Sequence, residues 1–201
     1  MAVETFCLRL SGKKSAERLA AAARDRFGGP LDILVANAGI EGPRGPTGGA
    51  EESDYLALFD VNLHSAYWLA AAVAPGMREA GGGAIVLMAS LAAMRGNRAI
   101  GPYAMSKAAL AQMARNLAVE FGPHAIRANA VDPGLIETPL SRALMSDEAF
   151  MQRRVAATPL RRIGQPSEIA ATVLWLVSPG GPFTTGQTIV VDGGTLVGDG
   201  S

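Results

Sequence analysis

Apolar residues along this chain gather in short runs, which are separated by longer segments with helical periodicity. Four runs predict strands that are buried on both faces, because hardly any polar residue alternates within them: 31–36, 84–89, 126–131 and 188–191. The intervening segments predict helices at 15–27, 52–79, 103–120, 139–156 and 166–178. We expect Ser15 to be the N-cap of the first helix, and Gly28-Gly29-Pro30 to end it.

A helix between each strand and the next is typical of a parallel sheet covered on both faces. We therefore predict an α/β fold: one domain over residues 1–201, with a three-layer, doubly wound, Rossmann-like and mostly parallel sheet. Right-handed crossovers bring the carboxyl ends of all the strands to one edge of such a sheet. Asn37, Ser90 and Pro133-Gly134 each follow a strand, so they should line one crevice, where ligands bind in open α/β sheets.

The composition narrows the class of protein. Hydrophobic residues make up 49% of the chain and charged residues 18%, a balance that indicates a folded core and excludes disorder. Lys plus Arg equals Asp plus Glu at 18 each, so no overall field attracts nucleic acid or an anionic membrane. We interpret the arginines at 153, 154, 161 and 162 as solvated charges around a turn.

Other residue types bear on the compartment and on metals. Cys7 is the single cysteine, which fits a reducing compartment. No run approaches the ~20 apolar residues that span a bilayer, so we expect a cytoplasmic protein without a membrane segment. Two histidines, His64 and His124, are too few and too scattered to indicate a metal site.

Tyr103 and Lys107 are the most informative pair, because a spacing of four places both on one helix face. An ammonium close to a phenol favours the phenolate, so we predict that Lys107 lowers the pKa of Tyr103 from ~10. Ser90, at the end of a strand, could hold a carbonyl oxygen against that phenol. Each residue also has a structural interpretation: Ser90 as a turn cap, Tyr103 as a core aromatic and Asn62 as a partner for backbone groups.

Several motifs occur together in a characteristic order: Asn37-Ala38-Gly39, Asn62, Ser90, Tyr103-x-x-x-Lys107, Pro133-Gly134-x-Ile136-x-Thr138 and a final Val191-Asp192-Gly193-Gly194. The identity and order of these motifs over residues 15–195 resemble those of the short-chain dehydrogenase/reductase family. The resemblance implies that Tyr103 is the general acid or base, that Lys107 lowers its pKa, and that Ser90 binds the substrate oxygen. Asn62 corresponds to the family's helix asparagine, which supports a water path to the lysine.

The resemblance also implies a cofactor, NAD or NADP, and a small alcohol or ketone substrate. Residues on the adenosine-ribose side would be Asn37, Ala38 and Gly39. Tyr103 and Lys107 would meet the nicotinamide ribose, and Pro133, Gly134, Ile136 and Thr138 the nicotinamide end. In the family the long helices and the last helix and strand pack between subunits, so we expect a homodimer or homotetramer.

One family element has no counterpart here. In members of the family about 80 residues precede the Asn-Ala-Gly motif, and they include a Thr-Gly-x-x-x-Gly-x-Gly turn that binds the pyrophosphate. In this sequence 36 residues precede Asn37. We therefore expect an N-terminally truncated sheet with an apolar edge at Ile33-Leu34-Val35, and residues 1–14 outside the family's third-strand position. We also expect weak binding of NAD(H) and NADP(H).

Two other functions compete with an NAD(P)-dependent oxidoreductase. The first is a truncated, non-catalytic scaffold that acts by binding or oligomerisation. The second is cofactor-independent chemistry, as in the halohydrin-cleaving relatives, which use arginine where Lys107 stands.

Overall fold

The computed structural model describes residues 12–46 and 48–198. Its sheet has four strands in the order β1-β2-β3-β4, and every neighbouring pair is parallel. The strands are β1 (Ile33–Ala36), β2 (Gly83–Met88), β3 (Ile126–Pro133) and β4 (Thr188–Val191). Met88 pairs with Val131, so the ends of β2 and β3 lie side by side and bring Ser90 close to Pro133. All four predicted strands are present, although β1 begins two residues later than expected, β2 is shifted by one residue and β3 ends two residues later.

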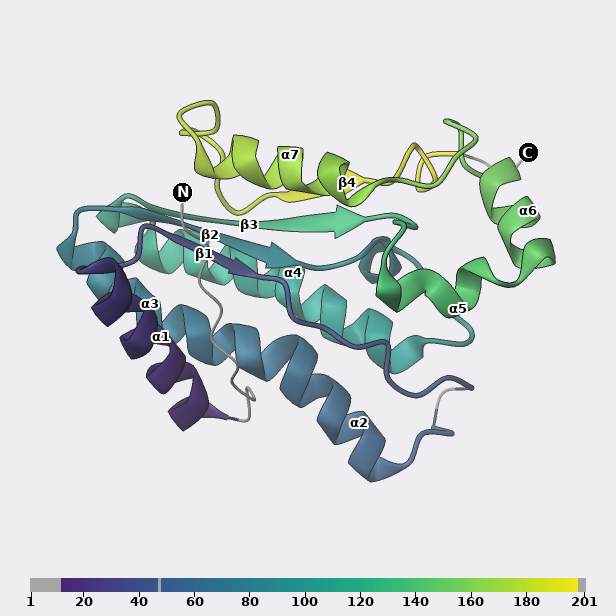
Figure 1. Cartoon of the computed structure of the whole chain (residues 1–201), viewed down its shortest axis with the longest axis horizontal. Helices are drawn as coiled ribbons and strands as arrows, with labels where there is room; N and C mark the ends of the chain where they lie inside the picture. The colour runs from purple at the N-terminus through teal and green to yellow at the C-terminus, as the bar shows by residue number, and fades with distance from the viewer. Residues whose placement is uncertain (1–11, 47, 199–201) are drawn as a thin grey trace.

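Helices connect the strands and cover both faces of the sheet, as Figure 1 shows. Below the sheet in that view lie α1 (Lys13–Phe27), α3 (Ser65–Glu79) and α4 (Gly101–Phe121), and above it lies α7 (Pro166–Val177). Ala128 and Ala130 of β3 pack with α3 and α4 in one buried cluster. Val131 of β3 packs with Ile169 and Leu176 of α7 in another. The predicted three-layer, parallel α/β fold is confirmed.

The segment predicted as one helix over 52–79 contains an irregular turn. α2 (Glu52–Phe59) continues through the π-helical turn η1 (Asp60–His64) into α3. By length and composition alone, Glu52–Glu79 is apolar enough to cross a bilayer, contrary to our expectation that no segment comes close. Its buried side chains, such as Ala70 and Met77, belong to the core cluster beneath the sheet, as in the core helix of a folded domain.

Two helical predictions need correction. The N-cap of α1 is Gly12 rather than Ser15, whose hydroxyl donates to the Gly12 carbonyl at 2.8 Å. The segment 139–156 is broken into η4 (Pro139–Ser141), α5 (Arg142–Met145) and α6 (Glu148–Ala156). Asp147 caps α6 by accepting the Phe150 N–H at 2.9 Å. The shorter helical turns are η2 (Leu91–Met94) and η3 (Gly122–His124).

The predicted apolar edge is present at β1, which pairs with β2 alone within the described residues. Ile33 and Val35 are 46% and 41% exposed there, an unusual state for apolar side chains of a sheet. Most of the segment 1–14, for which we predicted a position outside the third strand, is residues 1–11, and these lie outside the described residues. From Lys13 onward the chain is already in α1.

Candidate active site

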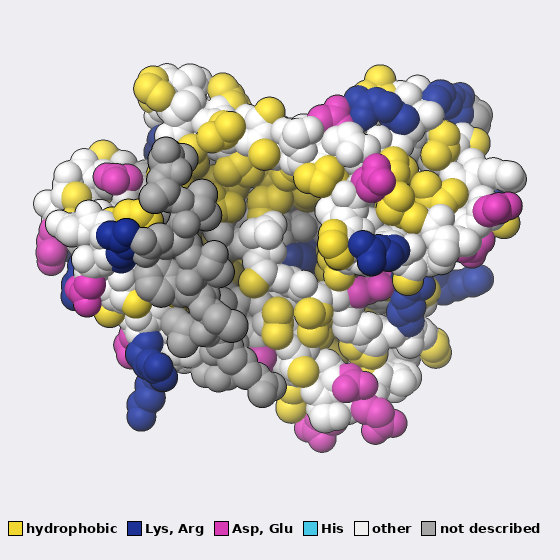
Figure 2. All heavy atoms as spheres, viewed as in Figure 1, with side chains coloured by type: hydrophobic (Ala, Val, Ile, Leu, Met, Phe, Trp, Pro, Cys, Tyr) yellow, Lys and Arg dark blue, Asp and Glu magenta, His cyan; other side chains and the backbone are white. Residues whose placement is uncertain are grey.

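A cavity of about 1010 Å³ opens at the carboxyl edge of the sheet. The ends of β1, β2 and β3, the start of α4, and the segments 135–154 and 166–174 contribute to its walls. Of the predicted site residues, these line it: Asn37, Gly39, Ser90, Tyr103, Lys107, Pro133, Gly134, Ile136 and Thr138. Ala38 and Asn62 do not. Figure 2 shows hydrophobic side chains gathered in the hollow below α7.

Asn62 does not line the cavity, but it connects two segments that do, the one after β1 and α4. Its side-chain amide donates to the Ile40 carbonyl at 2.9 Å and to Ser106 Oγ at 3.1 Å, and its Oδ1 accepts the Ile40 N–H at 2.8 Å. Ser106 Oγ in turn donates to the Tyr103 carbonyl at 2.8 Å. Asn62 is 1% exposed and stands in the π turn, so this irregular turn presents its amide to the segment after β1 and to α4. It satisfies backbone groups, as its structural interpretation proposed, and so positions the site.

Lys107 is buried, and its ammonium donates to the Met88 carbonyl at 2.7 Å. The same nitrogen lies 5.7 Å from the centre of the Tyr103 ring, so the four-residue spacing brings the pair together as predicted. A Cβ atom on residue 39 would lie 3.2 Å from Lys107 Nζ. Glycine at this position therefore leaves space at the ammonium, which has three donors and uses one of them on Met88.

The predicted direction of the Tyr103 pKa is wrong for the chain without a ligand. Burial raises the pKa of Tyr103 above 10.0, and the negative charges of Glu41 and Asp132 raise it further, while a hydrogen bond with the Ser90 side chain lowers it. Burial also lowers the pKa of Lys107 to about 8, against the attraction of Asp132. Desolvation disfavours the charged form of both groups, and it outweighs the attraction that the spacing alone suggested.

Ser90 has both of the roles considered for it. Its Oγ accepts the Ala92 N–H at 3.1 Å and so caps η2, which is the structural role. It also lies close enough to the Tyr103 phenol to lower its pKa, and both side chains line the cavity, where a carbonyl oxygen could meet the two hydroxyls.

Pro133 and Gly134 end β3 where it meets β4. The Gly134 N–H donates to the Val191 carbonyl at 2.9 Å, and a Cβ atom on residue 134 would lie 2.8 Å from Asp192 Cα. A larger residue would force these strand ends apart, so the sheet edge requires glycine there. Beyond it, Ile136 forms a parallel bridge with Gly164, which fixes the segment leading to Thr138.

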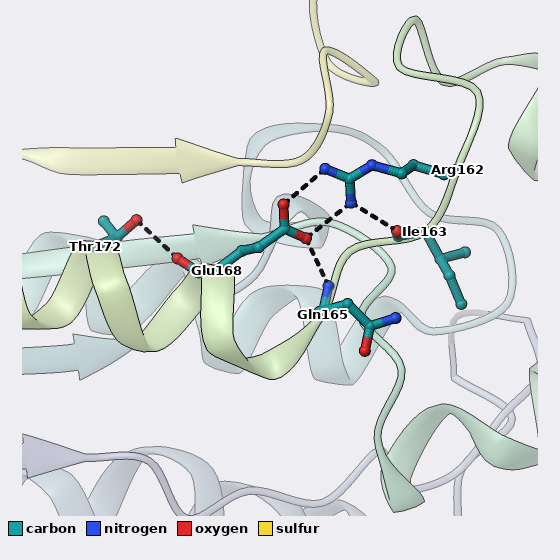
Figure 3. A network of polar contacts seen from close by, with 5 residues as sticks. All are labelled: Arg162, Ile163, Gln165, Glu168 and Thr172. Carbon is teal, nitrogen blue, oxygen red and sulfur yellow. Dashed lines mark hydrogen bonds and ion pairs between the residues drawn. The ribbon is translucent and has the colours of Figure 1, made fainter.

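A polar network at the start of α7 holds the segment around Gly164 in place (Figure 3). Arg162 donates to both carboxylate oxygens of Glu168, at 2.7 and 2.8 Å, and Glu168 accepts the Gln165 N–H at 2.8 Å. These two partners lower the pKa of Glu168 to about 2. Arg162 is thus engaged in an ion pair on the surface, which refines its interpretation as a solvated charge.

The residues present fit the nicotinamide ribose end of a dinucleotide. Gly39 leaves space beside the Lys107 ammonium, which lines the cavity, so ribose hydroxyls could accept the donors that it does not use on Met88. Asn37, Pro133, Gly134, Ile136 and Thr138 line the same cavity. Within the described residues no glycine-rich turn precedes a helix in the way that pyrophosphate binding requires.

Sequence reasoning overlooked three contributors. Ser106 stands inside the Tyr-Ala-Met-Ser-Lys motif and joins Asn62 to Tyr103. Asp132 is 0% exposed. The sequence feature that could have indicated its burial is a carboxylate at the end of an otherwise apolar strand. Arg154 is half-buried and lines the cavity, so its interpretation as a solvated charge is wrong.

The fold and the cavity define an α/β protein with a ligand crevice at the carboxyl edge of its sheet. The family model described as enoyl-(acyl carrier protein) reductase matches residues 3–195. A tropinone reductase homolog of Arabidopsis thaliana is 37% identical over 188 residues, which are 94% of this chain and 61% of that protein. This chain belongs to the short-chain dehydrogenase/reductase family.

Solved structures of other proteins are also similar to this chain. A gluconate 5-dehydrogenase from Burkholderia cenocepacia, in complex with NADP and tartrate, is 34% identical with a TM-score of 0.89, over 94% of this chain and 73% of that one. A 7α-hydroxysteroid dehydrogenase, complexed with NADH and 7-oxo glycochenodeoxycholic acid, is 36% identical with a TM-score of 0.86, over 93% and 72%. The chain therefore spans about three fifths to three quarters of the relatives named here.

Proposed function

We propose that this chain carries the proton-transfer site of an NAD(P)-dependent oxidoreductase that interconverts a secondary alcohol and a ketone. The observation that carries the proposal is the meeting of Ser90, Tyr103 and Lys107 in one cavity, with Gly39 leaving the ammonium accessible. Solved relatives support it, because one holds NADP with tartrate and another holds NADH with a 7-oxo compound.

In the reductive direction, Tyr103 donates its phenolic proton to the carbonyl oxygen, and the Ser90 hydroxyl hydrogen-bonds the same oxygen. The raised pKa of Tyr103 keeps the phenol protonated at neutral pH, so the acid form is ready. Lys107 then stabilises the phenolate that forms, which requires its ammonium to be charged. A nicotinamide supplies the hydride when it is bound, while the protein contributes position and proton transfer.

In the oxidative direction the roles are reversed, and Tyr103 must lose its proton before it can act as a base. Burial opposes that ionisation. A bound nicotinamide carries positive charge in its oxidised form, which adds to the charge of Lys107 and favours the phenolate. We therefore infer that Tyr103 becomes a base only in the presence of oxidised cofactor.

We further infer that these 201 residues bind NAD(H) and NADP(H) weakly, because the described residues include no glycine-rich turn at a helix N-terminus to donate to the pyrophosphate. Each charge-assisted bond to phosphate contributes about 1.5–3 kcal/mol, so losing several weakens binding by orders of magnitude. Titration of each reduced cofactor by fluorescence measures this directly. A micromolar dissociation constant would show that the chain has rebuilt the phosphate site, and would contradict the inference.

A homodimer or homotetramer remains our proposal for the assembly. Leu174 and Trp175 of α7 are 65% and 42% exposed, and Val190 of the neighbouring edge strand β4 is 36% exposed. The exposed apolar side chains of α7 and β4 favour a second copy as partner. The cytoplasmic location expected from the sequence also remains a prediction.

The experiment for the proposed function supplies millimolar NADH or NADPH, to offset weak binding, together with a panel of ketones. We expect loss of reduced nicotinamide in step with the formation of alcohol, for at least one ketone. A panel in which no ketone is reduced, although a cofactor is shown to bind, would favour the non-catalytic scaffold instead.

A further inference from the structure

Two arginines that line the cavity make no ion pair within residues 12–46 and 48–198. Arg154 lies on α6 and Arg95 lies just after η2, and both line the cavity that contains Ser90 and Tyr103. Neither guanidinium makes an ion pair or a hydrogen bond with any residue that the structure describes. Nε of Arg154 is buried and unpartnered, which is a costly state for a charged donor.

The other charged groups around the cavity do not neutralise this pair. Glu41 is already engaged by Arg44, at 2.6 Å. Asp147 directs a carboxylate oxygen to the N-terminus of α6, where it accepts the Phe150 N–H. Arg95 repels Arg154 and lowers its pKa further than burial alone, with only Asp192 acting in the other direction. The aspartate itself accepts the N–H groups of Gly194 and Leu196.

Arg154 is half-buried and Arg95 is exposed, so the desolvated charge is that of Arg154, and Arg95 repels it. A partly buried charge in this position is costly unless an anion from outside joins it. Guanidinium groups match carboxylates, which they bind with two parallel hydrogen bonds. Many of the other residues that line the cavity are apolar, among them Leu144 and Phe150. A ligand with a hydrocarbon body and one anionic end fits that distribution.

We propose that Arg154, assisted by Arg95, binds a carboxylate of the substrate, so that the substrate class is an oxo acid or the corresponding hydroxy acid. The proposal rests on the proposed function, since it assigns the substrate of the same cavity. Tyr103 and Ser90 hold the carbonyl oxygen at one end of the molecule, and the arginines hold the carboxylate at the other. The hydride and proton transfers are those of the proposed reaction, and the carboxylate takes no part in them.

Binding to the full 201-residue chain tests this without cofactor. The probes are a series of linear oxo acids that differ in the spacing between carbonyl and carboxylate, each paired with its neutral methyl ester, and the method is ligand-observed NMR. We expect at least one acid to bind about tenfold tighter than its ester or more, as one charge-assisted pair provides. Equal affinity of acid and ester throughout the series would overturn the proposal.

Variants locate the anion site. Arg154→Gln should abolish the preference for acid over ester, and Arg95→Gln should reduce it. Arg153→Gln is the matched control, because Arg153 is the neighbouring residue on α6 but is exposed and does not line the cavity. Loss of the preference in Arg153→Gln, or its persistence in a folded Arg154→Gln, would contradict the assignment. The comparison of acid with ester in the unmodified chain stands even if a variant fails to fold.

Three further outcomes distinguish a substrate carboxylate from a cofactor phosphate, and this proposal from the proposed function. If Arg154 bound a cofactor phosphate instead, Arg154→Gln would weaken NADPH binding and leave the acid preference unchanged, which overturns the proposal. A preference for acids in a chain that reduces no ketone would refute the proposed function alone. Reduction of neutral ketones without any preference for acids would refute the substrate class alone.

Discussion

Replacing Asp132 by asparagine should change the pH dependence of stability in a way that can be calculated from the structure. Asp132 follows Ile126, Ala128 and Ala130 at intervals of two along β3, so it faces α4 and Lys107 as they do. It is 0% exposed, and neither carboxylate oxygen makes a well-formed hydrogen bond with a described residue. Burial raises its pKa from 3.8 to about 6, although the Ser90 backbone, Lys107 and Arg115 all favour the ionised form.

The sign follows from proton linkage. A carboxyl group whose pKa is raised in the folded state contributes stability below pH 3.8, and this contribution is lost as the pH rises through 6. The ionised group therefore costs about 3 kcal/mol at pH 7.5 and roughly half of that at pH 5, since each pKa unit corresponds to about 1.4 kcal/mol. The Asp132→Asn variant would carry no such cost, since an amide does not titrate.

Urea unfolding of both proteins at pH 5 and pH 7.5 provides the test. The asparagine amide is as poorly hydrogen-bonded as the carboxyl group at both pH values, so the difference between the two pH values isolates the charge. We expect Asp132→Asn to gain on the order of 1 kcal/mol of relative stability from pH 5 to pH 7.5. Loss of the carboxylate also lowers the pKa of Lys107 further below 8, which acts in the same direction. A stability difference that is independent of pH would refute the reasoning.

Two other predictions follow from the site. Reduction should slow as the pH rises above about 8, because Lys107 then loses the proton whose charge stabilises the phenolate. A pH–rate profile of kcat/KM that stays flat to pH 10 would exclude this role. Gly134→Ala should cost about 1–3 kcal/mol in urea unfolding, because its Cβ would meet the Asp192 backbone at 2.8 Å. Gly96→Ala is its control, since no atom lies within 4 Å of a Cβ there, and equal stability of the two variants would contradict the steric argument.

The sequence predicted the sheet, its parallel order and the residues at its carboxyl edge, because each depends on local pattern and chain direction. Lys107 meets Tyr103 since one helical turn fixes their spacing. The direction in which the pKa of Tyr103 shifts depends instead on how deeply the tertiary structure buries the phenol, and residue spacing does not encode that burial. The π turn that presents Asn62 was hidden in the same way within an unbroken helical pattern.

The arginines illustrate the same limit. Arg153 and Arg154 are adjacent and chemically identical, and the composition around them is that of a solvated turn. Their difference arises from the break at Asp147, which sets the direction of α6 and places one arginine toward the cavity and the other toward solvent. Only the tertiary arrangement distinguishes a binding group from a surface charge.

The central claim is that Tyr103 transfers the proton in carbonyl reduction, and Tyr103→Phe tests it most directly. With saturating cofactor and a ketone that the unmodified chain reduces, we expect kcat to fall by about 10²–10⁴, the range that a general acid contributes. Tyr67→Phe is the matched control, because Tyr67 lies on α3, is 51% exposed and does not line the cavity, so its kcat should be unchanged. Reduction by folded Tyr103→Phe at the unmodified rate would contradict the claim.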